Sequence, residues 1–555
     1  MNAFQKPPQV DGDAQLIRTG LPLLRREPHA CPAGRALRAR PLLTQRPERS
    51  RRKPVEDFPF APWGAFLDAV EHRGQTLDRA TKIAGNTRRS SEAHVRWATE
   101  AAGVYLAARA REQSVRGAAG YPATRPVRKQ WVAANTLREP DGRGADRYER
   151  TAWGRQYASA NGRVRELWIP SIDSVKRDRP DSELAGIAHV MATGTPADLP
   201  FGERARLPDE PGVLPWRVRI IGVGLADGST HVLADWDVAE AEKQFGEHTR
   251  KLLSDVVDGR ELRPGQDCIG CEALSGCQAV PRIPGLLGAP APARPRKRRS
   301  VSVSDLRAYR DCPARYYLTR VLKLKDGRTE NEAIRRGRAV DDWLNRRHAV
   351  EPATPCRQVP LPDSLPGLSA EEFPAALAMI RNHRGRCPLD GLASGEKIEP
   401  QRRLAVYDPQ TDVVVIADCD LVHTDRGGVV VRETKTASYH FGERRELVRT
   451  YPQLALAVLL MASGSLGGDP RRSRIELEVL REDGARLEEV DPFDAVTLDQ
   501  SRRVVTELAA AWAADETYAP DPSRDSVCTG CEARRWCTSA RPVQQTPAED
   551  GDDAR

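Results

Sequence analysis

The two segments that decide the fold read Ile416-Ala417-Asp418-Cys419-Asp420-Leu421-Val422 and Val431-Arg432-Glu433-Thr434-Lys435-Thr436. Both are rich in branched apolar residues, as is the shorter segment Arg403 to Val406 that precedes them. Asp408-Pro409 and Gly427-Gly428 are turn signals between the three segments. The pattern therefore predicts a meander of three antiparallel strands.

Carboxylates and one lysine alternate along the second and third of these strands. Asp418 and Asp420 are two residues apart, as are Glu433 and Lys435, and period-two geometry puts each pair on a single face of its strand. Carboxylates from adjacent strands supply the oxygen ligands that magnesium prefers, and a nearby lysine can orient a metal-bound water and offset charge during phosphodiester hydrolysis. The alternative is an exposed strand face with an ordinary Glu-Lys neighbour pair.

Helical and extended patterns flank the meander on both sides. Apolar residues recur at helical spacing in residues 302–324, 333–350, 451–461 and 495–516, and Ile475 to Leu480 has the composition of a strand. The order of helices, meander, helix, strand and helix predicts an α/β core.

These residues resemble the core motifs of PD-(D/E)XK nucleases of the RecB type. The resemblance rests on the two strands quoted above, on Tyr451-Pro452-Gln453-Leu454-Ala455-Leu456 and on the opening Ser302 to Cys312-Pro313, and it covers roughly residues 301 to 540. It implies a restriction-endonuclease-like domain, with a central mixed sheet flanked by helices, that hydrolyses DNA with Mg²⁺ or Mn²⁺. By this resemblance Asp420 and Glu433 are metal ligands, Lys435 is the catalytic lysine, and Gln453 contacts DNA or positions the site.

One position departs from the family pattern. The family usually carries a metal-binding histidine four residues after the glycine that corresponds to Gly337, and here Asp341 stands in its place. An aspartate can ligate magnesium, so we expect Asp341, Asp420 and Glu433 to be the metal ligands. The preference for manganese and the exonuclease behaviour tied to that histidine are left open. We expect His348 to be a surface residue rather than a substitute.

Four cysteines bracket the predicted nuclease core, namely Cys312 before it and Cys528, Cys531 and Cys537 after it. Zinc, an iron-sulfur cluster and simple burial are the alternatives, and ordinary structural zinc sites usually draw on two close pairs. A cubane cluster suits one distant cysteine combined with a C-x2-C-x5-C group. The resemblance adds that one subgroup of RecB-type nucleases, which includes CRISPR-associated exonucleases, holds an iron-sulfur cluster (4Fe-4S) in this arrangement. We expect the remaining cysteines of this half to be buried or incidental: Cys356, Cys387 and Cys419.

The first half of the chain repeats the cysteine layout. Cys31-Pro32-Ala33 corresponds to Cys312-Pro313-Ala314, and Cys268, Cys271 and Cys277 have the same C-x2-C-x5-C gaps. Matching Val164-Arg165-Glu166 to Val431-Arg432-Glu433 sets Trp168 at the position of Lys435 and Trp153 at that of Asp420. We therefore predict two tandem restriction-endonuclease-like domains, the first of them degenerate but with cysteines for a second cluster. The alternative is a domain of other origin that shares the short cysteine motif by convergence.

The length and composition of the chain indicate how many domains it contains and where it is located in the cell. The 555 residues are 39% hydrophobic and 30% charged, which suits two or more domains, and the formal charge of +8 is weak support for nucleic-acid binding. No apolar run approaches the roughly 20 residues of a membrane span, and the first residues form no apolar signal segment, so we expect a cytoplasmic protein. We predict a flexible tail at residues 1–19, a degenerate domain at 20–280, a Pro/Arg-rich linker at 281–300, a nuclease domain at 301–540 and an acidic disordered tail at 541–555. The basic run of the linker could contact phosphates, but we expect it to be solvated.

Two functional classes follow. The first is a metal-dependent DNA nuclease, an exonuclease by resemblance, that acts in DNA repair, recombination or defence with an inactive first half. The second is a non-catalytic iron-sulfur or zinc protein that binds DNA or serves as a scaffold. The intact set Asp420, Glu433, Lys435 and Gln453 favours the enzyme. No G-x4-G-K-S/T phosphate loop is present, so we expect DNA and a helicase or another repair or defence protein as partners.

Overall fold

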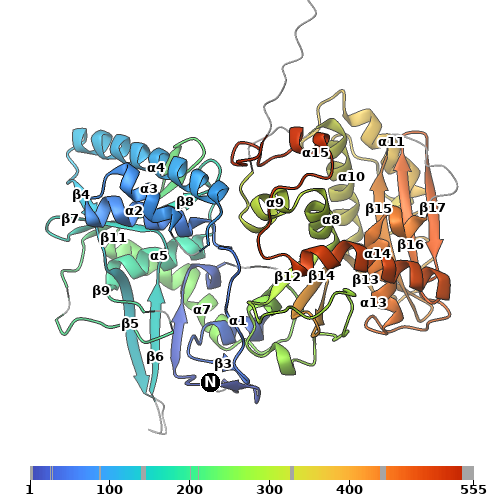
Figure 1. The fold of residues 1–555 in the computed structure, drawn as a ribbon, viewed down its shortest axis with the longest axis horizontal. Coiled ribbons are helices and arrows are strands. Elements are labelled where there is room, and N and C mark those ends of the chain that lie inside the picture. The colour runs from blue at the N-terminus through green and yellow to red at the C-terminus, as the bar shows by residue number, and fades with distance from the viewer. Residues whose placement is uncertain are drawn as a thin grey trace, which may run out of the picture.

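The computed structural model describes residues 4–25, 27, 29–86, 89–138, 145–200, 202–210, 212–325, 331–437 and 446–540. The predicted acidic tail at 541–555 lies outside these residues. The chain folds into two α/β halves that lie side by side, the first on the left of Figure 1 and the second on the right. Each half contains a mixed sheet flanked by helices, which confirms the predicted fold class.

A mixed sheet forms the centre of the second half. Its strands are β12 (Arg299–Ser302), β13 (Ile398–Asp408), β14 (Val413–Asp425), β15 (Gly428–Thr436), β16 (Arg474–Arg481) and β17 (Gly484–Val490). β13 pairs with one side of β14, while β12 and β15 pair with successive parts of its other side. The pairs β13–β14, β14–β15 and β16–β17 are antiparallel, and β15–β16 is parallel. The predicted meander is therefore confirmed.

Helices cover both faces of this sheet. They are α8 (Val303–Asp311), α9 (Pro313–Tyr316), the π-helical turn η5 (Tyr317–Val321), α10 (Glu332–His348), η6 (Cys356–Gln358), α11 (Phe373–Arg384), α12 (Leu447–Thr450), α13 (Pro452–Ala462), α14 (Ala495–Ala514) and α15 (Asp525–Thr529). Strand β16 shows the division, because Ile475 and Leu477 pack in one core with α13 and α14, whereas Leu480 packs in another with α10 and α11. This is the alternation that a strand covered on both faces requires.

A second mixed sheet lies in the first half, in the order β11-β10-β8-β7-β4. Its strands are β4 (Thr124–Pro126), β7 (Arg155–Ser159), β8 (Val164–Ser171), β10 (Arg217–Gly224) and β11 (Thr230–Asp237). The β8–β10 pair is parallel and the other pairs are antiparallel. Helix α5 (Asp181–Thr193) connects the parallel pair, as α13 connects β15 and β16. The succession of strand directions is thus the same as in β13, β14, β15, β16 and β17.

The first half also contains elements without a counterpart in this comparison. A four-stranded sheet has the order β2-β6-β5-β9, and β1 pairs with β3. These strands are β1 (Val10–Asp11), β2 (Leu16–Thr19), β3 (Thr44–Gln45), β5 (Gln130–Arg138), β6 (Ala145–Thr151) and β9 (Thr195–Ala197). The expected flexible tail of residues 1–19 is wrong from Val10 onward, because Leu16 and Ile17 are buried in this sheet.

The remaining helical elements of the first half cover its sheets. They are η1 (Leu21–Leu23), α1 (Pro32–Arg38), α2 (Phe60–Arg73), α3 (Leu77–Gly85), α4 (Glu92–Ala118), α6 (Val238–Gln244), the π-helical turn η2 (Phe245–Thr249), α7 (Arg250–Val257), η3 (Gln266–Gly270) and η4 (Leu274–Gly276). In the part of the chain that the structure describes, no helix combines the length and the apolar composition that a membrane span requires.

The basic run of the predicted linker is packed between the two halves. Arg298 is 2% exposed, donates to the carbonyl oxygens of Cys268 and Cys271 at 3.3 and 3.0 Å, and pairs with Asp412 at 2.9 Å. Arg296 is also buried, and Lys297 pairs with an aspartate of the first half. The expectation that this run is solvated is therefore wrong, since its side chains connect the first cysteine loop to the second sheet.

We expect Arg298→Ala to destabilise the protein by about 3 kcal/mol, because it leaves Asp412 and two carbonyl groups without their buried partner. Thermal unfolding of the full chain measures the effect. Arg294→Ala is the matched control, since Arg294 is exposed, and its unfolding midpoint should stay close to that of the wild type. Equal midpoints for both variants would contradict the bridging role.

Candidate active site

Asp420, Glu433 and Lys435 converge where strands β14 and β15 separate. The paired register ends at Leu421 with Arg432, so Asp420 and Glu433 are the next residues along each strand. Lys435 Nζ lies 3.0 Å from Glu433 Oε2 and 3.4 Å from Asp420 Oδ2. The backbone N–H of Thr434 donates to Asp420 Oδ2 at 2.8 Å, which orients that carboxylate. Three of the four residues that alternate along these strands, Asp420, Glu433 and Lys435, therefore meet at one point.

Asp341 approaches the same point from helix α10. Gly337, one turn earlier on that helix, lies so close to β15 that a Cβ atom there would stand 2.8 Å from Thr436 Oγ1. The missing side chain therefore lets the helix approach the strand. Asp341 shares the helix face of Gly337 because residues four apart are neighbours on a helix. Asp341 interacts electrostatically with both Asp420 and Lys435, so the site contains three carboxylates and one lysine.

The charges of this group are unbalanced. Burial, followed by the negative charge of Asp420, raises the pKa of Glu433 to about 7, and the same two causes raise the pKa of Asp341 to about 6. Burial by itself would lower the pKa of Lys435, but the charges of Asp420 and Glu433 outweigh burial and raise it. One ammonium group thus faces three carboxylates in a largely buried position. This arrangement fits a bound divalent cation, which would supply the missing positive charge.

Two other predicted residues lie at the edge of this group. Asp418 is exposed and paired with Arg403 of β13, so it stands apart from the buried carboxylates. Gln453 is the second residue of α13 and is half-buried, and no hydrogen bond among the described residues joins it to the carboxylates or to Lys435. Its predicted role as a helper therefore stays a prediction.

A basic groove of about 630 Å³ reaches Ile416 and Asp418 of β14. Six of the residues that line it are Lys53, Lys297, Arg320, Lys323, Arg403 and Asp418. Burial and the nearby charges of Arg320 and Lys325 lower the pKa of Lys323, although Asp305 opposes the shift. The groove therefore combines crowded positive charge around Lys323 with a lining that extends to Asp418, two residues before Asp420.

The corresponding position in the first half has the opposite charge balance. Glu166 is buried on β8, where it pairs with Arg116, lies 3.6 Å from Arg219 and accepts a hydrogen bond from Thr124 at 2.8 Å. Two guanidinium groups face this single carboxylate, so no further cation is needed. Trp168, two residues along the strand, is 1% exposed and packs in the apolar core.

The alignment of Trp153 with Asp420 is wrong. The residue opposite Glu166 on the neighbouring strand is Tyr157, whereas Trp153 precedes that strand and is 37% exposed. Trp153 instead contacts the rings of Phe58 and Phe60. The error arose because the register of β7 depends on its pairing with β8, which the spacing along the chain does not give.

The first cysteine set lines one cavity. Cys31, Cys268, Cys271 and Cys277 all border a space of about 350 Å³. The backbone N–H groups of Gly34 and Arg263 donate to Cys31 Sγ at 3.3 and 3.4 Å, and that of Gly265 donates to Cys268 Sγ at 3.4 Å. Burial raises the pKa of Cys268 to about 11 and that of Cys271 to about 12. Backbone donors around buried sulfurs form a cradle that favours thiolates once a metal has displaced their protons.

The second cysteine set is built in the same way. Cys312 lies between α8 and α9 because Pro313 begins the second helix, just as Cys31 precedes Pro32 and α1. Both C-x2-C segments form the same turn, with N–H to O distances of 3.3 Å for Cys271 to Cys268 and for Cys531 to Cys528. Burial, and to a lesser extent the neighbouring Cys312, raises the pKa of both Cys531 and Cys537, and Cys528 contributes to the shift of Cys537.

Neither cysteine set forms the tightest group of candidate ligand atoms. Among the described residues, the group whose ligand atoms all lie within 4.8 Å of one another is formed by His348, Cys356, His383 and Cys387.

The His/Cys group was missed by the sequence analysis. His348 is 7% exposed, so the expectation that it is a surface residue is wrong, while Cys356, Cys387 and Cys419 are buried as expected. A signal was present, because His383 and Cys387 are four residues apart at the end of a predictable helix.

Comparison with known protein families adds a match to this geometry. A family model described as the PD-(D/E)XK nuclease superfamily matches residues 300–538, and this part of the chain is a PD-(D/E)XK nuclease superfamily domain. The crystal structure of SSO0001 is 14% identical, with 44% of this chain and 87% of that chain covered and a TM-score of 0.22. A candidate exonuclease from Eubacterium rectale is 11% identical, with 44% and 90% covered and a TM-score of 0.28. No curated protein matches this chain.

We expect affinity for Mn²⁺ to fall as the pH falls through about 7 and then about 6, because protonation of Glu433 and Asp341 removes ligand charge. Without metal, these raised pKa values mean that the folded state binds protons more tightly than the unfolded state, so their contribution to stability falls as pH rises. Added Mn²⁺ should therefore raise the unfolding temperature more at pH 8 than at pH 6.

Calorimetric titration with Mn²⁺ at both pH values measures the binding. Asp418→Asn is the control, since Asp418 is outside the buried group and its loss should leave the pH dependence in place. Affinity that does not change between pH 6 and 8 would contradict the assignment of these carboxylates as ligands.

Proposed function

We propose that this protein is a divalent-metal-dependent DNA nuclease whose second half carries the active site and whose first half is an inactive duplicate. The observation that carries the proposal is the convergence of Asp341, Asp420 and Glu433 around Lys435 within the nuclease superfamily domain. An exonuclease of DNA repair, recombination or defence, located in the cytoplasm, is the form that the resemblance to RecB-type nucleases favours.

The three carboxylates would hold Mg²⁺ or Mn²⁺. Their oxygens are ligands of the kind that both ions take, and the charge imbalance described above fits such an ion. A cation bound there would polarise the scissile phosphate and lower the pKa of a bound water. Asp341 in place of a histidine makes an all-oxygen ligand set, which favours magnesium over softer metals.

Lys435 supplies the only ammonium group described within the carboxylate cluster. Its Nζ donates to Glu433 and Asp420 and also to the carbonyl oxygen of Thr434 at 3.0 Å, so its position is set from three sides. A lysine held in this way can donate to a phosphate oxygen or to the attacking water and can offset negative charge that develops in the transition state. Gln453 would contact DNA beside it.

The basic groove would guide DNA to this site. Arg320 and Lys323 are exposed and lie beside Lys325, and their mutual repulsion would be relieved by phosphate groups. The groove also takes Lys53 from the first half and Lys297 from the connecting segment, so both halves would contribute to substrate binding. A helicase or another repair or defence protein would supply unwound strands.

The duplicate is supported by topology and by charge. The two sheets share their succession of strand directions, the helix inside the parallel pair and the terminal cysteine turns. Glu166 is neutralised by arginines, Tyr157 stands opposite it, and Trp168 replaces the lysine. A carboxylate neutralised by two arginines has no charge left to attract a metal ion, so the first half would serve in DNA binding and in support of the second.

Each cysteine set would hold a 4Fe-4S cluster, with zinc as the alternative. The combination of one distant cysteine with a C-x2-C-x5-C group and the N–H donors to sulfur support the cluster. The first set packs against Val414 and Ile416 of β14, so its cofactor would join the first half to the nuclease sheet. The second would join the start of the domain at Cys312 to its end.

We expect Lys435→Ala to lower Mg²⁺-dependent DNA cleavage by about 100- to 1,000-fold, because it removes a positive charge that stabilises the transition state. Glu433→Gln should do the same, whereas Glu166→Gln should leave cleavage per folded molecule unchanged. End-labelled single- and double-stranded DNA, with Mg²⁺ or Mn²⁺, reports both rate and exonuclease polarity. If the wild type and Lys435→Ala shift DNA equally and neither cleaves it, the protein is a non-catalytic DNA-binding or scaffold protein instead.

We expect protein purified without oxygen to contain about eight iron atoms per chain and to absorb near 400 nm, as two 4Fe-4S clusters would. Cys271→Ser and Cys531→Ser should each remove about half of the iron. Cys419→Ser is the control, since Cys419 is buried but belongs to neither set, and it should keep all of it. Four thiolates bound to zinc in place of iron would overturn the cluster assignment.

A further inference from the structure

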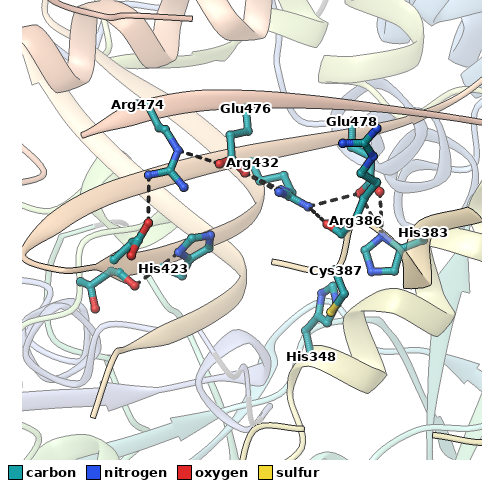
Figure 2. A network of polar contacts seen from close by, with 11 residues as sticks. His348, His383, Arg386, Cys387, His423, Arg432, Arg474, Glu476 and Glu478 are labelled. Carbon is teal, nitrogen blue, oxygen red and sulfur yellow. Dashed lines mark hydrogen bonds and ion pairs between the residues drawn. The ribbon is translucent and has the colours of Figure 1, made fainter. Parts of the chain in front are cut away.

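Four buried side chains outside the active site and both cysteine sets meet at one point. They are His348, Cys356, His383 and Cys387, and their ligand atoms all lie within 4.8 Å of one another. They come from four places in the fold: the last residue of α10, the turn η6, the last helical turn of α11 and the segment that follows it. Figure 2 shows His348, His383 and Cys387 turned toward a common point.

The distances suit a tetrahedral metal ion. His348 Nε2 lies 3.5 Å from Cys356 Sγ and 3.9 Å from Cys387 Sγ. A zinc ion with Zn–S bonds of about 2.3 Å and Zn–N bonds of about 2.0 Å separates neighbouring sulfur and nitrogen ligands by about 3.6 Å. The group thus has the ligand spacing of a Cys₂His₂ zinc site.

His383 is oriented for metal binding. Its Nδ1 lies 2.9 and 3.0 Å from the two carboxylate oxygens of Glu478, so the hydrogen belongs on Nδ1 and the lone pair on Nε2. Nε2 is buried and has no hydrogen-bond partner among the described residues. A buried nitrogen without a partner is costly, and a metal ion at the centre of the group would satisfy it.

A second layer of contacts supports this histidine (Figure 2). Arg432 of β15 lies 3.7 Å from Glu478 and donates to the carbonyl oxygen of Arg386, the residue before Cys387, at 2.6 Å. The N–H of Cys356 donates to Cys387 Sγ at 3.4 Å. A carboxylate behind a ligating histidine and a backbone donor to a ligating sulfur are the contacts that orient metal ligands in proteins.

The chemistry of the four donors selects the metal. Two thiolates and two neutral imidazoles balance the charge of one Zn²⁺, which is what a buried site requires. Soft sulfur donors disfavour magnesium and calcium, and the mixed S₂N₂ set in a closed tetrahedron, with no open position, suits structural zinc. A disulfide would use only the two cysteines and would leave both histidines unexplained.

We propose that His348, Cys356, His383 and Cys387 bind one structural Zn²⁺ that fixes the end of α10 to α11 and β16. Asp341 lies on the same helix, two turns before His348, so the zinc would hold the helix that carries an active-site carboxylate. The segment between α10 and α11, residues 349–372, has little regular structure. One metal ion bound by His348 before it and by His383 and Cys387 after it would stabilise it.

Zinc and iron content of the full chain, purified without oxygen from zinc-supplemented cells, tests the proposal. We expect one zinc per chain in the wild type, its loss in Cys356→Ser/Cys387→Ser, and unchanged iron in both. Cys419→Ser is the matched control for loss of a buried cysteine and should keep the zinc. Wild-type protein without zinc, or zinc retained by the double variant, would overturn the site.

The wild type alone provides a second measurement if the double variant does not fold. X-ray absorption at the zinc edge should show two sulfur and two nitrogen neighbours, at about 2.3 and 2.0 Å. Four sulfur neighbours would mean that zinc occupies one of the four-cysteine sets, and a Cys356–Cys387 disulfide found by mass spectrometry would mean that no ion binds here. Either result would refute the proposed zinc site.

Glu478→Gln tests the role of the carboxylate behind His383. Loss of the charge should weaken zinc binding by about 10- to 100-fold in competition with a coloured chelator. Glu476→Gln is the matched control, because Glu476 is buried on the same strand face and pairs with Arg432 and Arg474 but not with His383. Equal zinc affinity in the wild type and both variants would contradict the assigned ligand orientation.

Discussion

The ion-pair network centred on Arg432 is the interaction on which the second half depends. Arg432 lies on β15 next to Glu433 and donates to Glu476 at 2.7 Å, while also facing Glu478. These charges are buried between β15, β16 and α11, where an unpaired one would be very unfavourable. The network therefore fixes the register of the two parallel strands. Successive residues of a strand face opposite ways, so Glu433 and Lys435 lie on the face of β15 opposite to Arg432. On the face that carries Arg432, Glu478 orients His383.

The two halves show how one topology can carry opposite chemistry. Both place a glutamate on the strand that begins the parallel pair, namely Glu166 and Glu433. Around Glu433 the nearest charges are two further carboxylates and one lysine. Burial and the two carboxylates outweigh the lysine and raise the pKa of Glu433 to about 7, so a deficit of positive charge is left. Around Glu166 they are guanidinium groups, which remove that deficit. The difference lies in the charges that surrounding helices and strands bring to the carboxylate, not in the carboxylate itself.

Prediction from sequence succeeded where the signal is local. The meander and the helices around it depend on spacing within about twenty residues, and the structure has them with small shifts at their ends. The β2-β6-β5-β9 sheet was missed because β2 and β9 are far in the chain from the β5–β6 pair, and β17 was missed because it contains only one β-branched residue, Val490. Trp153 was misplaced because strand register depends on the neighbouring strand.

The sequence by itself determined which residues could carry chemistry: the alternating carboxylates and lysine of β14 and β15, and the two C-x2-C-x5-C groups. Those patterns are set by strand periodicity and turn geometry, which are properties of short segments. Only the tertiary structure decided which of them meet. Asp341 reaches Asp420 because Gly337 lets a helix lie close to a strand, Arg298 is buried because two halves enclose it, and four dispersed histidines and cysteines converge because α10, α11 and β16 pack together. Such encounters depend on long-range packing, and no local pattern encodes them.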